Sequence, residues 1–263
     1  MEAASAPAGR VWGVFEGLTV GAANRGRRTL VVAIDGPSGS GKSSTARAVA
    51  RRLGLAFLDT GAMYRAITWL AEHEGVDLSD NAAVARLLAG ARLDVMTDPD
   101  DPAIAISGHD VTAAIRDPEV SAAVSAVATN LDVRADLIAR QRAIIAAADG
   151  IVAEGRDITT VVAPEAQVRV LLVADPAERV ARRHAELGES IDADAVKDQV
   201  IRRDRDDSTV AEFEAAAPGV TVIDSTYLTL DEVVEAICAL VPPSYAGGLA
   251  RTGGPGSGED AAP

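Results

Sequence analysis

The sequence predicts an α/β fold in which a parallel sheet is covered by helices on both faces, and three observations support it. Short apolar runs alternate with amphipathic helical stretches between residues 29 and 241. Most of these runs are rich in Val, Ile and Leu with little alternation, as in strands buried on both faces. The chain has 263 residues, 48% hydrophobic and 24% charged, which suits a globular protein with a sizeable core.

The apolar runs and the helical periodicity give the expected elements in chain order. The strands are expected at 30–34, 56–58, 151–153, 168–173 and 220–223, and the helices at 42–53, 62–73, 131–148, 176–187 and 230–240. Asp175-Pro176 and Thr229 are typical signals for the start of a helix. These elements account for a five-stranded sheet and its two helical layers.

One region, residues 91–112, interrupts the alternation of strand and helix. It predicts two strands, each followed by a turn, and helical stretches flank it: strands 92–96 and 103–107, turns 98–102 and 108–110, helices 81–89 and 117–128. We expect a small antiparallel lobe inserted after the second helix, over about residues 75–130.

The two ends of the chain have the composition of segments that do not pack a core. Residues 1–28 are rich in Ala and Gly, and we expect a flexible N-terminal extension. Residues 242–263 contain the run GGPGSG, and we expect a disordered tail.

Charge and cysteine content exclude several classes of function. Lys and Arg total 25 against 39 Asp and Glu, a net charge of −14, which argues against a general binder of nucleic acid or anionic membranes. No stretch reaches the roughly 18 apolar residues of a membrane span, and the N-terminus does not resemble a signal peptide. Cys238 is the single cysteine, so no disulfide forms within the chain. We expect a soluble, cytoplasmic protein, and the net charge still permits a small anionic ligand held by a local cluster of cations.

Residues 36–43, the phosphate loop, read GPSGSGKS and match G-x-x-x-x-G-K-[ST] between a strand and a helix. Glycines let successive backbone N–H groups surround a phosphate at the positive end of the following helix. Lys42 is placed to reach the β- and γ-phosphates, and the Ser43 hydroxyl to bind Mg²⁺. The loop predicts binding of a nucleoside triphosphate with Mg²⁺. The sequence has neither the N-K-x-D motif of GTP switches nor the L-S-G-G-Q signature of transporter ATPases.

Three further segments place arginines where a second anion would bind, as a kinase of a small molecule requires. They are residues 59–65 (DTGAMYR), 154–157 (EGRD) and 202–208 (RRDRDDS). The first two follow strands, at the carboxyl edge of the sheet where ligands bind in such folds. The third lies on a polar helix, 192–207, that we expect to move as a flap. Arginines at three such positions in an acidic chain predict a second phosphate site.

These four motifs, in this order and spacing over about residues 30–240, resemble the bacterial cytidylate kinases. The resemblance implies a P-loop nucleoside-monophosphate kinase fold over residues 29–241, with a parallel five-stranded sheet. It also implies an inserted antiparallel monophosphate-binding lobe and a mobile helical lid at about 182–210. The implied reaction is ATP + CMP → ADP + CDP, with dCMP also accepted. We expect a monomer, because lobes that close over the substrates must move independently.

The resemblance also assigns residues. It assigns ATP to Gly36, Pro37, Ser38, Gly39, Ser40, Gly41, Lys42, Ser43 and Ser44, and CMP to Thr60, Tyr64, Arg65, Ser125, Arg134, Arg156, Asp157, Arg203 and Asp207. Among these, Lys42, Arg156 and Arg203 are expected to be catalytic, and Ser43 to bind Mg²⁺. The acceptor phosphate is assigned to Arg65 and Arg156. The cytosine is assigned to Ser125, Arg134 and Asp157.

Two positions depart from the family pattern. Val210 stands where the family usually has an arginine, and Thr159 where it usually has a glycine. We expect Arg205 to substitute for the missing cation, and Thr159 to be strained if its position requires a positive φ. Two alternatives remain open: a kinase of another small acceptor, such as UMP, a sugar or shikimate, and a nucleotide-binding regulator without transfer activity.

Overall fold

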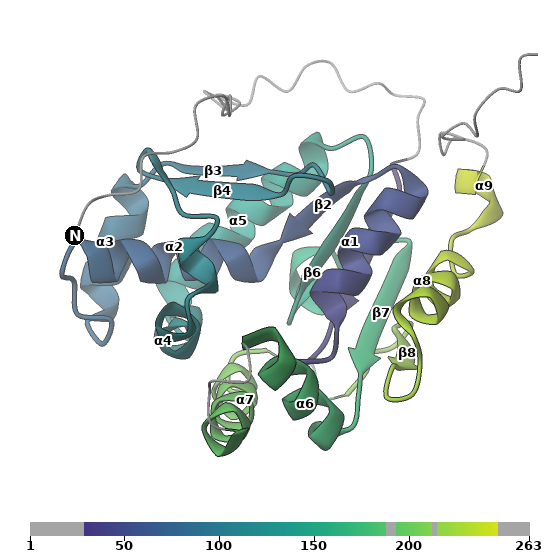
Figure 1. Ribbon diagram of the computed structural model, residues 1–263. Coiled ribbons are helices and arrows are strands. Elements are labelled where there is room, and N and C mark those ends of the chain that lie inside the picture. The colour runs from purple at the N-terminus through teal and green to yellow at the C-terminus, as the bar shows by residue number, and fades with distance from the viewer. Residues whose placement is uncertain (1–28, 188–192, 212–214, 247–263) are drawn as a thin grey trace, which may run out of the picture.

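The computed structural model describes residues 29–187, 193–211 and 215–246 (Figure 1). Its centre is a five-stranded sheet in the order β2-β6-β1-β7-β8, with every neighbouring pair parallel. The strands are β1 (Val31–Asp35), β2 (Ala56–Asp59), β6 (Ile151–Gly155), β7 (Val168–Val173) and β8 (Thr221–Asp224). The sequence predicted all five within two residues at each end, because strands buried on both faces leave a distinct apolar run.

The register of the parallel strands brings their carboxyl ends together. Asp35 at the end of β1 lies opposite Gly155, and Asp59 at the end of β2 lies opposite Glu154. The segments that follow β1, β2 and β6 therefore start from one edge of the sheet.

One face of the sheet is covered by α1 (Lys42–Leu53) and α8 (Leu230–Cys238), which pack against each other. Val32 and Ile34 of β1 point into this layer, where they meet the buried face of α1. Helix α8 starts at a capping box, because the Thr229 hydroxyl accepts from the backbone N–H of Glu232 while the Glu232 carboxylate accepts from Thr229. The expected start signal at Thr229 is confirmed.

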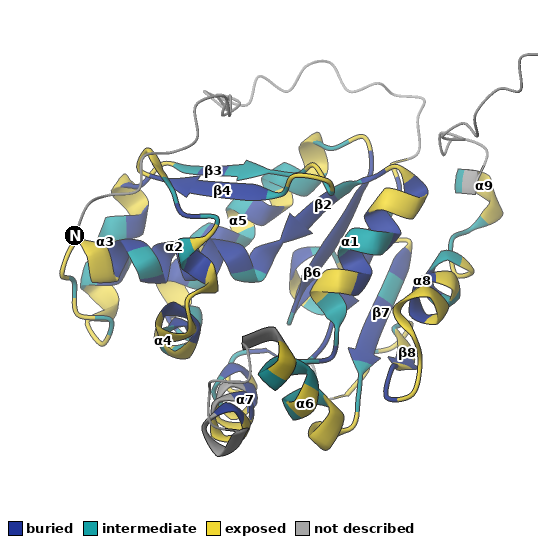
Figure 2. Cartoon of the chain, in the orientation of Figure 1, coloured by how far each residue is buried: buried dark blue, intermediate teal, exposed yellow. Residues whose placement is uncertain are grey.

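The opposite face is covered by a larger group of helices: α2 (Thr60–His73), α3 (Asn81–Gly90), α4 (Pro118–Ala128) and α5 (Leu131–Ala147). Helix α2 is the centre of this layer, and most of its residues are buried between the sheet and the outer helices (Figure 2). Ala33 of β1 faces this layer, alternating with Val32 and Ile34.

The region that interrupts the alternation forms a three-stranded antiparallel sheet of β3 (Leu93–Met96), β4 (Ala103–Ile106) and β5 (His109–Asp110). The prediction of a turn at 108–110 is wrong. The turn is Ser107-Gly108, and residues 109–110 form the third strand. Both turn residues have positive φ, 49° and 84°, which is the geometry of a two-residue hairpin turn.

This small sheet is attached to the parallel sheet rather than separate from it. The Phe57 N–H of β2 donates to the Thr97 carbonyl at 2.8 Å, and Arg47 of α1 donates to the Pro99 carbonyl at 2.6 Å. Ile104 and Ile106 of β4 belong to the same apolar core as α2. The insert and the parallel sheet therefore share one core.

Two further helices, α6 (Pro176–Leu187) and α7 (Ala193–Asp207), pack against each other below the carboxyl edge of the sheet (Figure 1). Helix α7 also contacts α4. A short 3₁₀ turn, η1 (Ala114–Arg116), precedes α4, and one π-helical turn, η2 (Ile158–Val162), follows β6. These elements complete the surroundings of the sheet edge.

The prediction of a disordered tail from residue 242 is wrong for its first residues. Residues 243–246 form a short helix, α9 (Pro243–Ala246), and Tyr245 packs against the core beside α8. A proline suits the first position of a helix, and the aromatic ring has apolar surface to bury, so the Pro-rich composition was misleading here. The expected N-terminal extension, 1–28, and the rest of the tail, 247–263, lie outside the described residues. In the described parts of the chain, no helix is long and apolar enough to cross a membrane.

Candidate active site

A cavity of about 250 Å³ opens at the carboxyl edge of the parallel sheet. Its walls are the phosphate loop, the first turn and a half of α2, one face of α4, the segment after β6 and the C-terminal end of α7. All of the motifs singled out in the sequence therefore meet in one place, because each follows a strand or faces the sheet edge.

The phosphate loop has the backbone geometry that a bound phosphate requires. Gly39 and Gly41 have φ of 76° and 84°, in the left-handed region that favours glycine. A side chain at Gly36 would place its Cβ 2.3 Å from the Leu172 carbonyl oxygen. Helix α1 begins after Gly41, which has no side chain to cap it, so the first turn can accept an anion instead.

Lys42 and Ser43 are the first two residues of α1, and both line the cavity. The Lys42 Nζ donates to the Pro37 carbonyl at 3.1 Å, and the Ser43 hydroxyl donates to the Glu154 Oε1 at 2.5 Å. Glu154 is buried at the end of β6; burial and the charge of Asp59 raise its pKa to about 7. A hydroxyl and a carboxylate are oxygen ligands of the kind that Mg²⁺ prefers, so this pair fits the expected cation.

Glu154 is a site residue that the sequence analysis quoted but did not assign. Its position was the available signal, since it lies next to the last residue of β6, the strand that pairs with β1, and β1 leads into the phosphate loop.

Two arginines that line the cavity, Arg65 of α2 and Arg116 of η1, are held by one carboxylate. Asp59 accepts from the Arg65 Nη2 at 3.0 Å and from the Arg116 Nη2 at 3.4 Å, and it also caps α2 through the Ala62 N–H. Burial opposes the charge of Asp59, but the two guanidiniums hold its pKa below the usual value. Gly61 leaves room for this arrangement, since a Cβ there would lie 3.1 Å from the Arg65 Nη1. Sequence analysis missed Arg116, which no motif marks.

An ion pair joins Arg134 of α5 to Asp157, which follows β6. The Arg134 Nη2 donates directly to the Asp157 Oδ2, and the Nη1 donates to the Ala128 carbonyl at 3.4 Å. Both side chains are about nine-tenths buried and line the cavity. Burial raises the pKa of Asp157, although Arg134 acts against this shift. The pair presents a guanidinium and a carboxyl side by side to a ligand.

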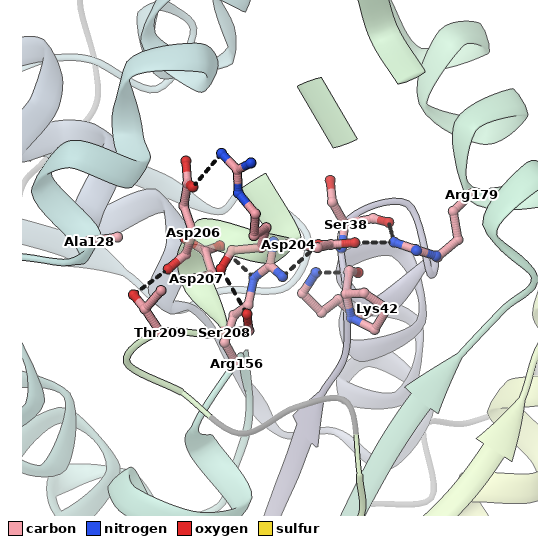
Figure 3. A network of polar contacts seen from close by, with 12 residues as sticks. Ser38, Lys42, Ala128, Arg156, Arg179, Asp204, Asp206, Asp207, Ser208 and Thr209 are labelled. Carbon is pink, nitrogen blue, oxygen red and sulfur yellow. Dashed lines mark hydrogen bonds and ion pairs between the residues drawn. The ribbon is translucent and has the colours of Figure 1, made fainter. Parts of the chain in front are cut away.

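The end of α7 closes over the phosphate loop through a network of ion pairs (Figure 3). Asp204 accepts from the Ser38 N–H at 3.1 Å and pairs with Arg156 at 2.8 Å and with Arg179 of α6. Arg156 also pairs with Asp207 at 2.9 Å. A carboxylate of α7 therefore contacts the groups that would bind phosphate oxygens, an N–H of the loop and two arginines.

Most of the predicted residues line this cavity. They are Ser38, Gly39, Gly41, Lys42, Ser43, Ser44, Thr60, Tyr64, Arg65, Arg134, Arg156, Asp157 and Asp207. Gly36, Pro37 and Ser40 belong to the same loop but not to the cavity surface. Ser125 is half-buried on α4 between the lining residues Val124 and Ala128. Arg203 lies in α7, and its side chain is outside the described residues.

The two departures have different outcomes. Val210 lines the cavity, while Arg205 is three-quarters exposed and pairs with Asp206 at 3.4 Å, so it does not occupy the place of the missing cation. Arg183 of α6 lines the cavity, a cation that the sequence analysis did not single out. The expected strain at Thr159 is wrong, because Ser107 is the non-glycine residue with positive φ among those described.

Comparison with known proteins agrees with this geometry. The sequence profile of the cytidylate kinase family matches residues 32–242. A cytidylate kinase of Cutibacterium acnes is 59% identical over 214 residues, which are 81% of this chain and 96% of that protein. The cytidylate kinase of Streptomyces avermitilis is 44% identical over 81% of this chain and 92% of its own length. With its phosphate loop, its arginine clusters and its relatives in agreement, the chain belongs to the cytidylate kinase family.

Proposed function

We propose that this protein transfers the γ-phosphate of ATP to CMP, and also to dCMP, giving ADP and CDP or dCDP. The observation that carries the proposal is the buried Arg134–Asp157 pair, which lines the same cavity as the phosphate loop. Relatives named cytidylate kinases, 59% and 44% identical over most of the chain, support the choice of acceptor.

Asp157 and Arg134 offer the groups that distinguish cytosine from uracil. An ionised carboxyl such as Asp157 accepts from the exocyclic amine of cytosine, where uracil presents a carbonyl instead. Arg134, oriented by its bond to Asp157, donates to acceptor atoms of the base. Neither contact involves the sugar, which is why we propose that CMP and dCMP are both accepted.

The transfer requires alignment and charge neutralisation rather than activation of a nucleophile. The phosphate of CMP is already largely ionised at neutral pH, so the barrier comes from bringing two anions together. Lys42 at the donor and Arg65, Arg156 and Arg203 at the acceptor supply positive charge. Ser43 and Glu154 would hold Mg²⁺, which when bound neutralises charge on the β- and γ-phosphates.

Helices α6 and α7 act as the lid in this proposal. Phosphate oxygens of the bound substrates replace the Asp204 carboxylate as partners of Arg156 and Arg179. The closed lid then excludes water that would otherwise hydrolyse ATP. We also propose that the protein acts as a monomer, in which the lid is free to move over the phosphate loop. ATP and CMP are cytoplasmic metabolites, and we place the reaction there.

The first test is a coupled assay of ADP release with Mg-ATP alone and with CMP, dCMP, UMP or AMP. We expect strong release with CMP and dCMP and little with UMP. Release that depends on another acceptor instead would favour the kinase of that acceptor. ATP binding without release under any condition would favour the regulator.

A second test addresses recognition of the base. Asp157→Asn places an amide where the carboxylate accepts from cytosine, so we expect KM for CMP to rise about tenfold or more and the preference over UMP to fall. Asp136→Asn, on the same α5 as Arg134 but paired with Arg140, is the control. An unchanged preference for CMP over UMP in Asp157→Asn would contradict the proposed role.

A further inference from the structure

Asp35, the last residue of β1, carries a buried carboxylate that the proposed reaction does not use. It is 1% exposed and immediately precedes Gly36, the first residue of the phosphate loop. Its Oδ1 accepts from the Ile158 N–H at 2.8 Å. Its Oδ2 accepts from the Thr159 N–H at 2.8 Å and from the Thr159 hydroxyl at 2.6 Å. Three donors at the start of η2 therefore bond to one side chain, that of Asp35 on β1.

These bonds cap η2. The first N–H groups of a helical turn have no partner within it, and the side chain of the N-cap residue usually accepts from them. The N-cap residue of η2 is Asp157, whose side chain makes no capping bond and pairs with Arg134 instead. Asp35 supplies the cap in its place, from the neighbouring strand.

We propose that Asp35 is a positioning residue for the acceptor base: by capping η2 from β1, it leaves the Asp157 carboxyl to face the cavity and fixes its place relative to the phosphate loop. This inference rests on the proposed role of Asp157 in binding cytosine. Thr159, one of the two departures from the family pattern, contributes to the same positioning through its two hydrogen bonds to Asp35.

The linkage is short and tightly packed. Asp35 is covalently joined to Gly36 and hydrogen-bonded to Ile158, the residue after Asp157, so few bonds separate the donor and acceptor sites. Gly155, opposite Asp35 in the sheet, has no room for a side chain, since a Cβ would lie 2.5 Å from the Thr60 hydroxyl and 2.8 Å from Ile158. A rigid support of this kind holds a binding group within the narrow range of positions that recognition requires.

The bond from the Thr159 hydroxyl to Asp35 requires a residue with a hydroxyl at position 159. This bond also affects the charge of Asp35. Burial raises the pKa of Asp35 to about 6, with a smaller contribution from the charge of Asp157. The two bonds from Thr159 act in the opposite direction and favour the ionised form, which accepts from all three donors. A glycine at 159 would supply the N–H bond alone.

The test compares three variants on η2. Thr159→Val removes the hydroxyl and keeps the volume, Thr159→Ser keeps the hydroxyl, and Thr160→Val removes the neighbouring hydroxyl, which does not bond Asp35. We expect Thr159→Val to raise KM for CMP about three- to tenfold while KM for ATP and kcat change less than about twofold. Thr159→Ser and Thr160→Val should behave as the wild type.

Asp35→Asn extends the test to the acceptor itself. Its amide can accept through one oxygen only, so we expect weaker binding of CMP than in Thr159→Val, with binding of ATP, measured by calorimetric titration, unchanged within about twofold. The Thr159 series decides the question if this variant does not fold.

The outcomes separate this inference from the proposed function. An inactive wild type would contradict the proposed function itself. An active wild type with an unchanged KM for CMP in Thr159→Val would overturn the inference alone. Equal losses for CMP and ATP, or a Thr159→Ser variant that does not recover, would also overturn it, because they indicate general damage to the core.

Discussion

Three carboxylates hold three arginines against the cavity: Asp59 holds Arg65, Asp157 holds Arg134 and Asp204 holds Arg156. Each of these arginines is nearly nine-tenths buried, so an isolated charge there would be costly without its partner. The pairing explains how an acidic protein keeps cations in place for anionic ligands.

Val210 is the residue at which the site lacks a cation. It lines the cavity beside Asp207, and no arginine of α7 described in the structure replaces it. We expect Val210→Arg to raise kcat with CMP about tenfold, because a charge-assisted contact contributes about 1.5–3 kcal/mol. Steady-state kinetics with CMP and ATP would measure the change.

Thr209→Arg is the matched control for that substitution. Thr209 is exposed and its hydroxyl donates to the Asp206 carbonyl, outside the cavity. The same charge placed one residue away should leave kcat within about twofold. If both variants equal the wild type, then position 210 does not contact the phosphates and the argument from the family pattern is wrong.

At the scale of elements, Asp204 joins α7 to the phosphate loop by a hydrogen bond and to two arginines by ion pairs. Asp204 joins α7 to Ser38 of the loop, to Arg156 after β6 and to Arg179 of α6. Its burial opposes ionisation, but these partners hold its pKa below the usual value. When nucleotide binds, phosphate oxygens can replace the Asp204 carboxylate at the same two arginines, so charge still holds the lid over the phosphate loop.

The prediction that follows concerns stability. Asp204→Asn leaves Arg156 and Arg179 short of negative charge, and we expect the free energy of unfolding to fall by about 2 kcal/mol in urea titrations without nucleotide. Saturating Mg-ATP should reduce this difference, because phosphate oxygens neutralise the same arginines.

Asp206→Asn is the control in the same helix. Asp206 pairs with the exposed Arg205 at 3.4 Å, so its loss should change stability by less than about 0.5 kcal/mol. Equal effects of the two substitutions would show that Asp204 does not fasten the lid.

At the scale of the whole molecule, the buried Asp35 makes stability depend on pH. Its pKa is raised from 3.8 to about 6 in the folded protein, so the folded state binds this proton more readily than the unfolded chain. The group therefore contributes stability that is fully present below pH 3.8 and is lost as pH rises through about 6. A shift of this size corresponds to at most about 3 kcal/mol.

Asp35→Asn, which does not titrate, isolates this effect. We expect the difference in free energy of unfolding between the wild type and Asp35→Asn to shift in favour of the wild type as pH falls from 8 to about 5. Urea unfolding at several pH values measures the difference, and the other titrating groups cancel. A difference that stays constant over this range would show that the pKa of Asp35 is not raised.

The elements and the phosphate loop were predictable from the sequence because their signals are local. Buried parallel strands leave apolar runs, the capping box at Thr229 starts a helix, and the phosphate loop needs its glycines at fixed spacing. The errors also arose locally: the Ser107-Gly108 turn was placed too late, and Tyr245 lies in a Pro-rich segment that still packs.

The sequence by itself determined the α/β elements, the phosphate loop, the arginine motifs and the family they resemble. Only the tertiary structure decided which side chains meet: Glu154 with Ser43, Arg116 with Asp59, Asp204 with Ser38, and Asp35 with Thr159. These partners are between 57 and 166 residues apart in sequence. The register of the sheet and the packing of the helices bring them together, and no local pattern encodes such a contact.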